Sequence, residues 1–425
     1  MFCLNRFTRI MPGIGLSAAM ASLVVMVAAT GGCAISPAEP LEREVRLGGL
    51  FSLTGNWSTL GQNSKAAMEL AVEDVNRYLA GNAARVRFVA DIEDTRLMPE
   101  LALEEAQALR KRGVQLLIGP QSSAEVAYLK PFVDENRMLL VSPSSTAGSL
   151  AIPGDNIFRF TPADSVEGVA VSALMWDDGI RTVIPVWRND AGNTGLEAAT
   201  RARFTALGGT MLEGVRYDAD VKDFTTITAK LRSQVMQAVA HQGSAKVVAV
   251  YLAAFDEVAP FFAQIHDDPV LGSVSWYGSD GVALSEAILS NSRAVAFAIH
   301  TGYPNPIFGL DEGARDIWEP LVQRIRARTN LEPDAFSLAV YDAIWVVARG
   351  YIASGAPQDI EKLKQAIMTA AASGYGATGW TVLNEAGDRR YGDFDFWEIQ
   401  LDGDVPHWRR VAQYATRTGR IVRLH

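Results

Sequence analysis

The sequence predicts an α/β protein with two Rossmann-like lobes, each built on a parallel central sheet. Strand-like and helix-like segments alternate from Val45 to about Leu289, which is the pattern of a doubly wound sheet. The apolar runs at 114–118 and 139–141 are typical of parallel strands buried on both faces. A chain of 425 residues is also too long for one typical domain.

The elements follow in two similar series and a mixed end. In the first series, strands are expected at 45–53, 85–90, 114–118 and 139–141, and helices at 64–79, 99–112 and after Ser122. In the second, helices are expected at 165–176, 193–207, 224–237 and 255–266, and strands at 182–187, 210–217, 245–252 and 273–277. The C-terminal part of the sequence predicts helices at 336–352 and 360–372 and strands at 380–383 and 394–401.

The first 32 residues are typical of a signal peptide. Arg6 and Arg9 form a short basic region, and an almost wholly apolar stretch follows at 14–30. The segment ending at Cys33 resembles the lipobox of bacterial lipoproteins, which implies that Cys33 becomes the lipidated first residue of the mature chain. Residues 33–44 then form a tether. A plain signal peptide cut at 34–38 and a retained membrane anchor are the alternatives.

Composition narrows the possible functions. Cys3 and Cys33 are the only cysteines, so the mature domain has no disulfide and no cysteine-based metal site. The first 32 residues hold two positive charges and no acid, so the formal net charge of −9 becomes −11 in the mature chain. An acidic exported domain argues against nucleic acid, or an anionic membrane surface, as a partner. We therefore expect contact with the membrane through the lipid anchor only.

Two turns rich in serine and threonine form the best candidate site. They follow the strands at 114–118 and 139–141, and Ser122 or Ser123 is placed to cap the helix after the first turn. A helix N-terminus has free N–H groups and a partial positive charge, so it receives carboxylates well. Turns at the carboxyl ends of neighbouring parallel strands form a ligand crevice. The candidate side chains are those of Ser122, Ser123, Ser144, Ser145 and Thr146.

Seven segments in order resemble the type I periplasmic binding proteins, in the branch that binds leucine, isoleucine and valine. The resemblance covers residues 45–410. Its segments are VRLGGLFSLTGNWSTLGQNSKAAMELAVEDVN, LLIGPQSSAEV, LLVSPSSTA, VWRNDAGNTGLEAA, SWYGSDG, PDAFSLAVYDAIWVVARG and GATGWTVLNEAGDRRYGDFDFWEI. It implies two lobes joined by a three-crossover hinge. The implied N-terminal lobe is 45–160 with 302–376, the C-terminal lobe is 161–301 with 377–416, and 417–425 is a tail.

The resemblance also implies how an amino acid would be held. Its carboxylate would bind the hydroxyl and backbone N–H groups of Ser123 and Thr146. Its ammonium would meet the carbonyl of Ser145 and the carboxylate of Asp280. An Asx-turn or a helix N-cap is the alternative role of Asp280, and plain capping is the alternative for the hydroxyl residues.

Some positions depart from the amino-acid binders. Gly192 and Asn193 stand where the family has a Tyr-Gly pair, and Leu252 lies near a position that often carries tyrosine. Trp57 replaces smaller residues of the first loop and is expected either to cover an apolar or aromatic ligand or to pack on its own lobe. The side-chain pocket is therefore expected to differ from that of the relatives.

The sequence favours a binding protein over an enzyme. The five histidines have no metal spacing, and GxSxG and GxxxxGK[ST] motifs are absent. We expect no cofactor and no metal. The predicted function is an extracytoplasmic solute-binding lipoprotein that delivers an amino acid or related carboxylate to an ABC permease. The alternative is a ligand-sensing regulator, or a lipoprotein activator of cell-wall enzymes, acting through a protein partner.

Overall fold

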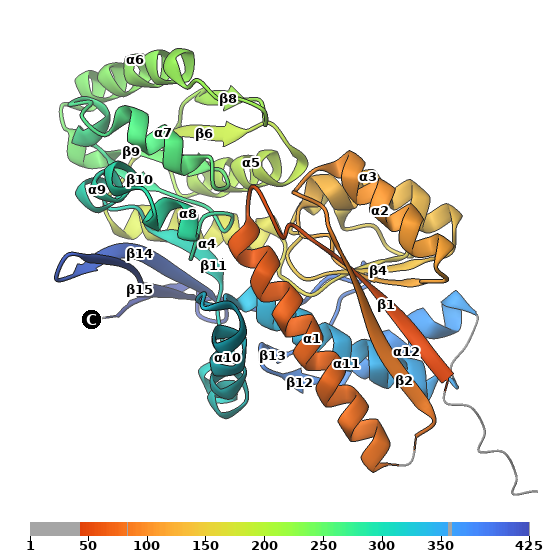
Figure 1. The fold of residues 1–425 in the computed structure, drawn as a ribbon. Helices are drawn as coiled ribbons and strands as arrows, with labels where there is room; N and C mark the ends of the chain where they lie inside the picture. The colour runs from red at the N-terminus through yellow and green to blue at the C-terminus, as the bar shows by residue number, and fades with distance from the viewer. Residues whose placement is uncertain (1–42, 83, 356–358, 425) are drawn as a thin grey trace, which may run out of the picture. The chain divides into compact units, whose positions relative to one another are not determined.

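The computed structural model describes residues 43–82, 84–355 and 359–424 (Figure 1). The expected signal peptide, most of the tether and Cys33 lie outside these residues. The described part begins directly with a strand and contains three larger sheets and one short hairpin.

The first sheet is parallel throughout and has the order β2-β1-β3-β4-β5. Helices α1, α2 and α3 connect its first four strands, as expected for right-handed crossovers. We call this sheet and the helices packed on it the N-lobe. Its elements are β1 (Arg43–Phe51), α1 (Ser58–Gly81), β2 (Val86–Asp94), α2 (Pro99–Lys111), β3 (Leu116–Ile118), α3 (Ser123–Glu135), β4 (Leu139–Ser142), the 3-10 turn η1 (Gly148–Leu150) and β5 (Ile157–Arg159).

The second sheet is also parallel, with the order β10-β9-β6-β7 and with β8 paired to β6. We call this sheet and its helices the C-lobe. Its elements are α4 (Asp164–Asp177), β6 (Thr182–Arg188), α5 (Ala191–Ala206), β7 (Thr210–Met211), β8 (Val215–Tyr217), α6 (Thr225–Gln242), η2 (Ala245–Val247), β9 (Val248–Ala253), α7 (Val258–Ile265), η3 (Leu271–Ser273), β10 (Ser275–Tyr277), α8 (Glu286–Leu289) and α9 (Ser292–Thr301).

The rest of the chain returns to both lobes. Helices α11 and α12 pack in the same core as α1, whereas β14 and β15 pack against α4 in the C-lobe. Strands β11, β14, β15 and β16 form an antiparallel sheet in that order. These elements are β11 (Asn305–Phe308), η4 (Glu312–Ala314), α10 (Arg315–Thr329), α11 (Ala335–Ala353), α12 (Ile360–Ala372), the hairpin β12 (Tyr375–Gly376) and β13 (Gly379–Trp380), β14 (Phe394–Asp402), β15 (Val405–Ala415) and β16 (Arg420–Arg423).

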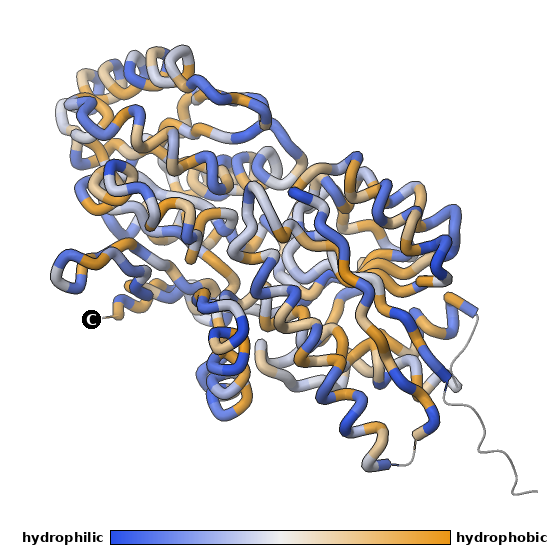
Figure 2. The backbone as a smooth tube through the Cα atoms, in the orientation of Figure 1, coloured by the Kyte–Doolittle hydropathy of each residue, from blue (hydrophilic) through white to orange (hydrophobic). Residues whose placement is uncertain are grey.

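Each sheet has an apolar core on both faces. In the N-lobe, α1, α11 and α12 cover one face, while α2 and α3 cover the other. In the C-lobe, α6, α7 and α9 cover one face, while α4 and α5 cover the other. The central strands are largely hydrophobic along their length in Figure 2, which is why continuous apolar runs mark them in the sequence. The predicted α/β fold with two parallel sheets is confirmed.

The structure contains β5, α9, α10, β11 and β15, which were not expected, and it differs from the expected elements in further places. Residues 210–217 form two short strands rather than one, because Gly214 between them has a φ of +78°, which breaks the extended chain. Helix α1 starts at Ser58, six residues before the expected start at Ser64. The expected tail beyond residue 416 contains β16, which pairs with β15.

A buried ion pair holds the segment before β14, where the chain passes back to the C-lobe, against the N-lobe. The guanidinium of Arg159, at the end of β5, contacts the carboxylate of Asp388 with N–O distances of 2.5 and 2.7 Å. Both side chains are at most 3% exposed. Arg159 also donates to the carbonyl of Ala147, at 2.6 Å. The segment that returns to the C-lobe at β14 is thereby tied to the serine-rich turn after β4.

Candidate functional site

The turn after β3 begins α3 with a capping box. The Ser122 hydroxyl accepts from the Glu125 amide at 3.3 Å, and Glu125 Oε2 accepts from the Ser122 amide at 3.1 Å. The two side chains thereby satisfy donors that the start of a helix leaves free. The predicted capping role of Ser122 is confirmed, and Ser123 becomes the first residue of the helix.

Ser123 joins the two serine-rich turns. Its hydroxyl oxygen accepts from the amides of Thr146, at 3.2 Å, and Ala147, at 3.1 Å. It also lies 3.0 Å from the hydroxyl oxygen of Ser145. The Ser144 hydroxyl donates to the carbonyl of Gln121 at 2.9 Å. The structure therefore brings the two predicted turns together, and each of the five hydroxyl side chains is at most 5% exposed.

Replacing Ser123 by alanine is expected to lower the free energy of unfolding by about 1–3 kcal/mol. The change leaves two buried amides without their acceptor, and a buried unsatisfied donor carries that cost. Urea denaturation of the two proteins measures the difference. Serine-to-alanine replacement at Ser373, an exposed residue at the end of α12, is the control and should change stability by less than about 0.5 kcal/mol.

On the C-lobe side, Asp280 lies against two further carboxyl groups. Its amide donates to Glu167 Oε1 at 3.2 Å, and Asp164 stands three residues before Glu167, at the start of α4. Burial, with the neighbouring Asp164 charge, raises the pKa of Asp280 to about 8. Burial raises the pKa of Asp164 to about 7 and that of Glu167 well above its usual value. Asp280 does not cap a helix, since Ser285 caps α8.

The start of α5 faces the serine-rich turns. A side-chain carbon placed on Gly192 would lie 3.6 Å from the Ser123 hydroxyl oxygen. The Asn193 side chain donates to both carboxylate oxygens of Asp190, the N-cap of α5. Leu252 is fully buried in the C-lobe core, on the face covered by α6, α7 and α9. The structure thus places Gly192 beside the serine-rich turns, and Leu252 in a core instead.

Trp57 lies between the lobes. Its ring centroid is 4.7 Å from that of Phe255, in the C-lobe, and 6.2 Å from that of Phe336, in α11. The side chain is 5% exposed, and the residue has a left-handed φ of 62° just before α1. Trp57 therefore packs against the opposite lobe rather than only on its own.

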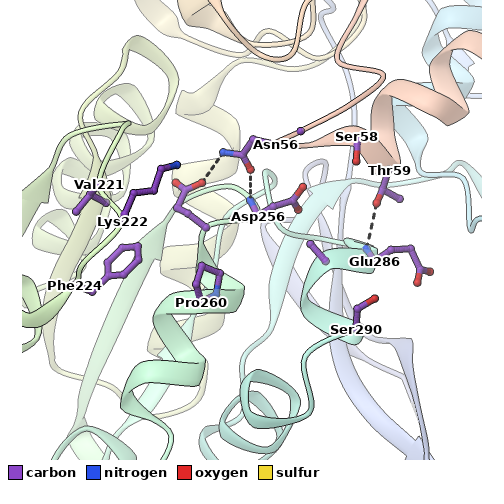
Figure 3. A pocket seen from close by; sticks show the side chains of 13 residues that line it. Asn56, Ser58, Thr59, Val221, Lys222, Phe224, Asp256, Pro260, Glu286 and Ser290 are labelled. Carbon is purple, nitrogen blue, oxygen red and sulfur yellow. Dashed lines mark hydrogen bonds between the residues drawn. The ribbon is translucent and has the colours of Figure 1, made fainter.

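Hydrogen bonds beside Trp57 join the lobes directly (Figure 3). Asn56 donates to Glu257 Oε2 at 2.8 Å and accepts from the Asp256 amide at 2.9 Å. The Trp57 amide donates to Asp256 Oδ2 at 2.6 Å. Thr59 accepts from the Glu286 amide at 3.2 Å, which Figure 3 also shows. We call the contacts of Asn56, Trp57 and Thr59 with the C-lobe the latch. They border a cavity of about 480 Å³ lined by both lobes.

A charged network continues from the latch toward α5. Arg188, at the end of β6, lies 2.9 Å from Asp190 and 3.4 Å from Glu257. Glu257 also accepts from the Tyr217 hydroxyl at 3.0 Å. Burial raises the pKa of Asp190, while the Arg188 charge opposes the rise. The charge of Arg188 is thus shared between two carboxylates of its own lobe.

Sequence reasoning missed several residues of this region. Asp164 and Glu167 lie in the first turn of α4, and nothing in the sequence pattern placed them beside Asp280. Gln121 is fully buried, and its side-chain oxygen Oε1 accepts from the Ser52 amide, which links the ends of β3 and β1. Its position in the first serine-rich turn is the sequence feature that could have identified Gln121 as a residue of the site. Within the described ranges, no group of three or more His, Cys, Asp or Glu side chains has a metal-binding arrangement.

Comparison with known proteins agrees with this architecture. Residues 44–387 match the family described as periplasmic binding protein. An uncharacterized protein of Methanocaldococcus jannaschii is 29% identical, over 89% of this chain and 92% of its own. A Leu/Ile/Val-binding protein of Rhizobium johnstonii is 24% identical, over 76% and 83%. The crystal structure of a leucine-binding protein of Thermotoga maritima superposes with a TM-score of 0.70 at 21% identity, covering 86% of this chain and 97% of that one.

Proposed function

We propose, since this chain belongs to the periplasmic binding protein family, that it is the solute-binding component of an ABC importer and binds an amino acid or related small carboxylate between its lobes. The observation that carries the proposal is the pairing of two opposed surfaces. The N-lobe presents the buried hydroxyl cluster around Ser123, and the C-lobe presents Gly192 and the carboxyl group of Asp280. The Rhizobium relative, named a Leu/Ile/Val-binding protein, supports the choice of an amino acid.

The two surfaces suit the two ends of an amino acid. The solute carboxylate would bind at Ser123 and Thr146, replacing the bonds that these residues now make with each other. The ammonium would bind the Ser145 carbonyl and Asp280. Ser122 and Ser144 would hold the turns in place, while Trp57 and Asn193 would shape the remaining pocket.

Transport would depend on closure of the lobes around the solute. Closure adds cleft contacts that the open form lacks, so binding shifts the population toward the closed form. The permease would then recognise that form. We further propose that the chain is exported to the periplasm and anchored through a lipid on Cys33, with no other membrane attachment. The assignment requires no enzyme activity and no cofactor.

Thermal unfolding of the purified mature protein with each of the amino acids tests the proposal. A solute present at a hundred times its Kd stabilises the folded form by about 2.7 kcal/mol, which is a clear upward shift of Tm. Asp280→Asn should raise the Kd obtained from the Tm shift at least tenfold, whereas Asp404→Asn, on an exposed hairpin turn, should leave that Kd unchanged. If no amino acid or small carboxylate shifts Tm, the importer assignment fails and a regulator acting through a protein partner is favoured.

A further inference from the structure

Three carboxyl groups form one buried surface on the C-lobe side of the cleft. They belong to Asp164, Glu167 and Asp280, whose exposed fractions are 2%, 1% and 5%. We call them the carboxyl wall. The Asp280 amide holds Glu167 at 3.2 Å, and the Asp164 amide donates to the Thr146 carbonyl at 2.9 Å. The wall therefore adjoins the serine-rich turns, where the carboxylate of an amino acid would bind.

The neighbouring cations are already paired elsewhere. Arg159 is bound to Asp388, and Arg188 lies between Asp190 and Glu257. Among the residues that the structure describes, no lysine, arginine or histidine forms an ion pair with any member of the wall. Buried carboxyl groups without a cation must bind protons or a positively charged ligand.

Unpartnered polar atoms at the wall indicate that a ligand is the missing partner. The Tyr251 hydroxyl is fully buried, and the charges of Glu167, Asp280 and Asp164 all act on it. The Thr200 hydroxyl lies beside it, and the Thr146 hydroxyl and the Gly148 amide lie beside Asp164. Within the described chain, however, none of these contacts reaches hydrogen-bond geometry at the Tyr251 hydroxyl, at either Asp164 oxygen or at Glu167 Oε2. Buried polar groups in native proteins are nearly always satisfied, so these atoms mark a place for polar ligand groups.

The approach to the wall is also acidic. A cavity of about 690 Å³ lies beside it, with walls from η1 of the N-lobe and α5 of the C-lobe. Asp164 and Asp190 line it, and its described lining contains no lysine, arginine or histidine. Gly195 borders it, and a side-chain carbon there would come within 2.2 Å of Asp164 Oδ2. Because residue 195 is a glycine, there is room for the Asp164 carboxyl group.

We propose that the carboxyl wall selects a solute with a net positive charge, namely a basic amino acid or an amine in which an amide replaces the carboxylate. The inference rests on the proposed function and narrows its substrate class. One ammonium balances one carboxylate of the wall, so with a neutral amino acid the other acidic groups must stay protonated, whereas a second positive charge allows another of them to ionise. A solute carboxylate at Thr146 would also face Asp164. Aromatic or aliphatic acids without an amine are therefore excluded.

Binding of such a cation is expected to release protons. Burial favours the protonated carboxyl groups in the solute-free protein, whereas a bound ammonium favours the ionised ones. Affinity for a fixed cation should therefore rise with pH through the range in which Asp164 and Asp280, with pKa values of about 7 and about 8, ionise in the solute-free protein. Tyr251 lies beside these groups, the charge of Arg159 lowers the pKa of Asp164, and the charge of Asp190 raises the pKa of both Asp164 and Asp280, so the two outer charges act on the slope in opposite directions.

The test is titration calorimetry of the mature protein with l-lysine, l-leucinamide, l-leucine and benzoate. We expect l-lysine and l-leucinamide to bind at least tenfold more tightly than l-leucine, and benzoate not to bind. The l-lysine Kd should fall at least threefold from pH 6 to pH 8. At pH 6.5 its apparent enthalpy should differ between phosphate and imidazole buffers, since released protons are taken up by the buffer.

Variants separate the wall from the rest of the site. Glu167→Gln keeps the acceptor for the Asp280 amide, so it should fold, and it should weaken l-lysine at least tenfold and reduce the pH dependence. Glu398→Gln, a partly buried glutamate on β14, is the matched control and should do neither. If l-leucine binds as tightly as the cations, or if benzoate binds, the inference is wrong while the proposed function stands. If none of the four probes binds and no amino acid shifts Tm, the proposed function itself fails.

Discussion

Replacing Asn56 by alanine is expected to raise the solute Kd about 10- to 100-fold. Asn56 makes two hydrogen bonds across the lobes, one of them to the carboxylate of Glu257. A hydrogen bond to a charged group contributes about 1.5–3 kcal/mol, and each 1.4 kcal/mol changes an equilibrium tenfold. The lost contacts join the two lobes, so their removal favours the open form. The observed Kd therefore rises as the closed fraction falls.

Two measurements distinguish this effect from damage to the solute pocket. Small-angle scattering of the solute-free Asn56→Ala protein should show a larger radius of gyration than the wild type, because the open population grows. Its free energy of unfolding, from urea denaturation, should stay within about 1 kcal/mol of the wild type, since both lobe cores are intact. Asn82→Ala, at the exposed end of α1, is the matched control. An unchanged radius together with an unchanged Kd would show that the latch does not govern closure.

Replacing Asp388 by alanine is expected to lower the free energy of unfolding by about 3–5 kcal/mol. The change strands the guanidinium of Arg159, which is 1% exposed, without its carboxylate. A buried charge left alone is among the costliest defects that a point mutation produces. Because Arg159 also holds the Ala147 carbonyl, the turn that carries Thr146 should loosen, and solute affinity should fall as well.

Chemical denaturation with a matched pair of variants measures the cost. Glu73→Ala removes an ion pair with Arg328 that is exposed on both sides, and it should cost less than about 1 kcal/mol. The double variant Arg159→Met with Asp388→Leu removes both charges and should recover much of the lost stability. If Asp388→Ala lowers the free energy of unfolding no more than Glu73→Ala does, the buried pair does not hold the segment before β14 against the N-lobe.

The sequence predicted the two parallel sheets well because their signal is local. Strands such as β4 are buried on both faces, so their apolar runs are continuous, and α12 begins and ends where its pattern does. Elements that are short, or that depend on pairing with another strand, were harder to predict. The strand at 210–217 is interrupted where Gly214 turns left-handed, and β16 was missed because its pairing with β15 comes from tertiary structure.

Residue patterns by themselves predicted the candidate site only on the N-lobe side, whereas Asp280 and Gly192 on the C-lobe side were named through the family resemblance. Ser122 to Thr146 lie on two turns at neighbouring strand ends, so sheet geometry alone brings them together. The C-lobe side assembles from α4, α5 and the turn after β10, and nothing local relates Glu167 to Asp280, 113 residues away. Leu252 was placed near the site by its position on β9, but strand alternation directs it into the core covered by α6 and α7.

The amino-acid sequence by itself determined that this chain forms two parallel-sheet lobes and that serine-rich turns follow β3 and β4. Hydrophobic periodicity and turn chemistry act between near neighbours, so they can be seen in the sequence. Tertiary structure alone decided that Asn56 meets Asp256, 200 residues later, and that three carboxyl groups share one buried surface. Such contacts depend on how the lobes pack, and burial then changes the charge that those groups carry.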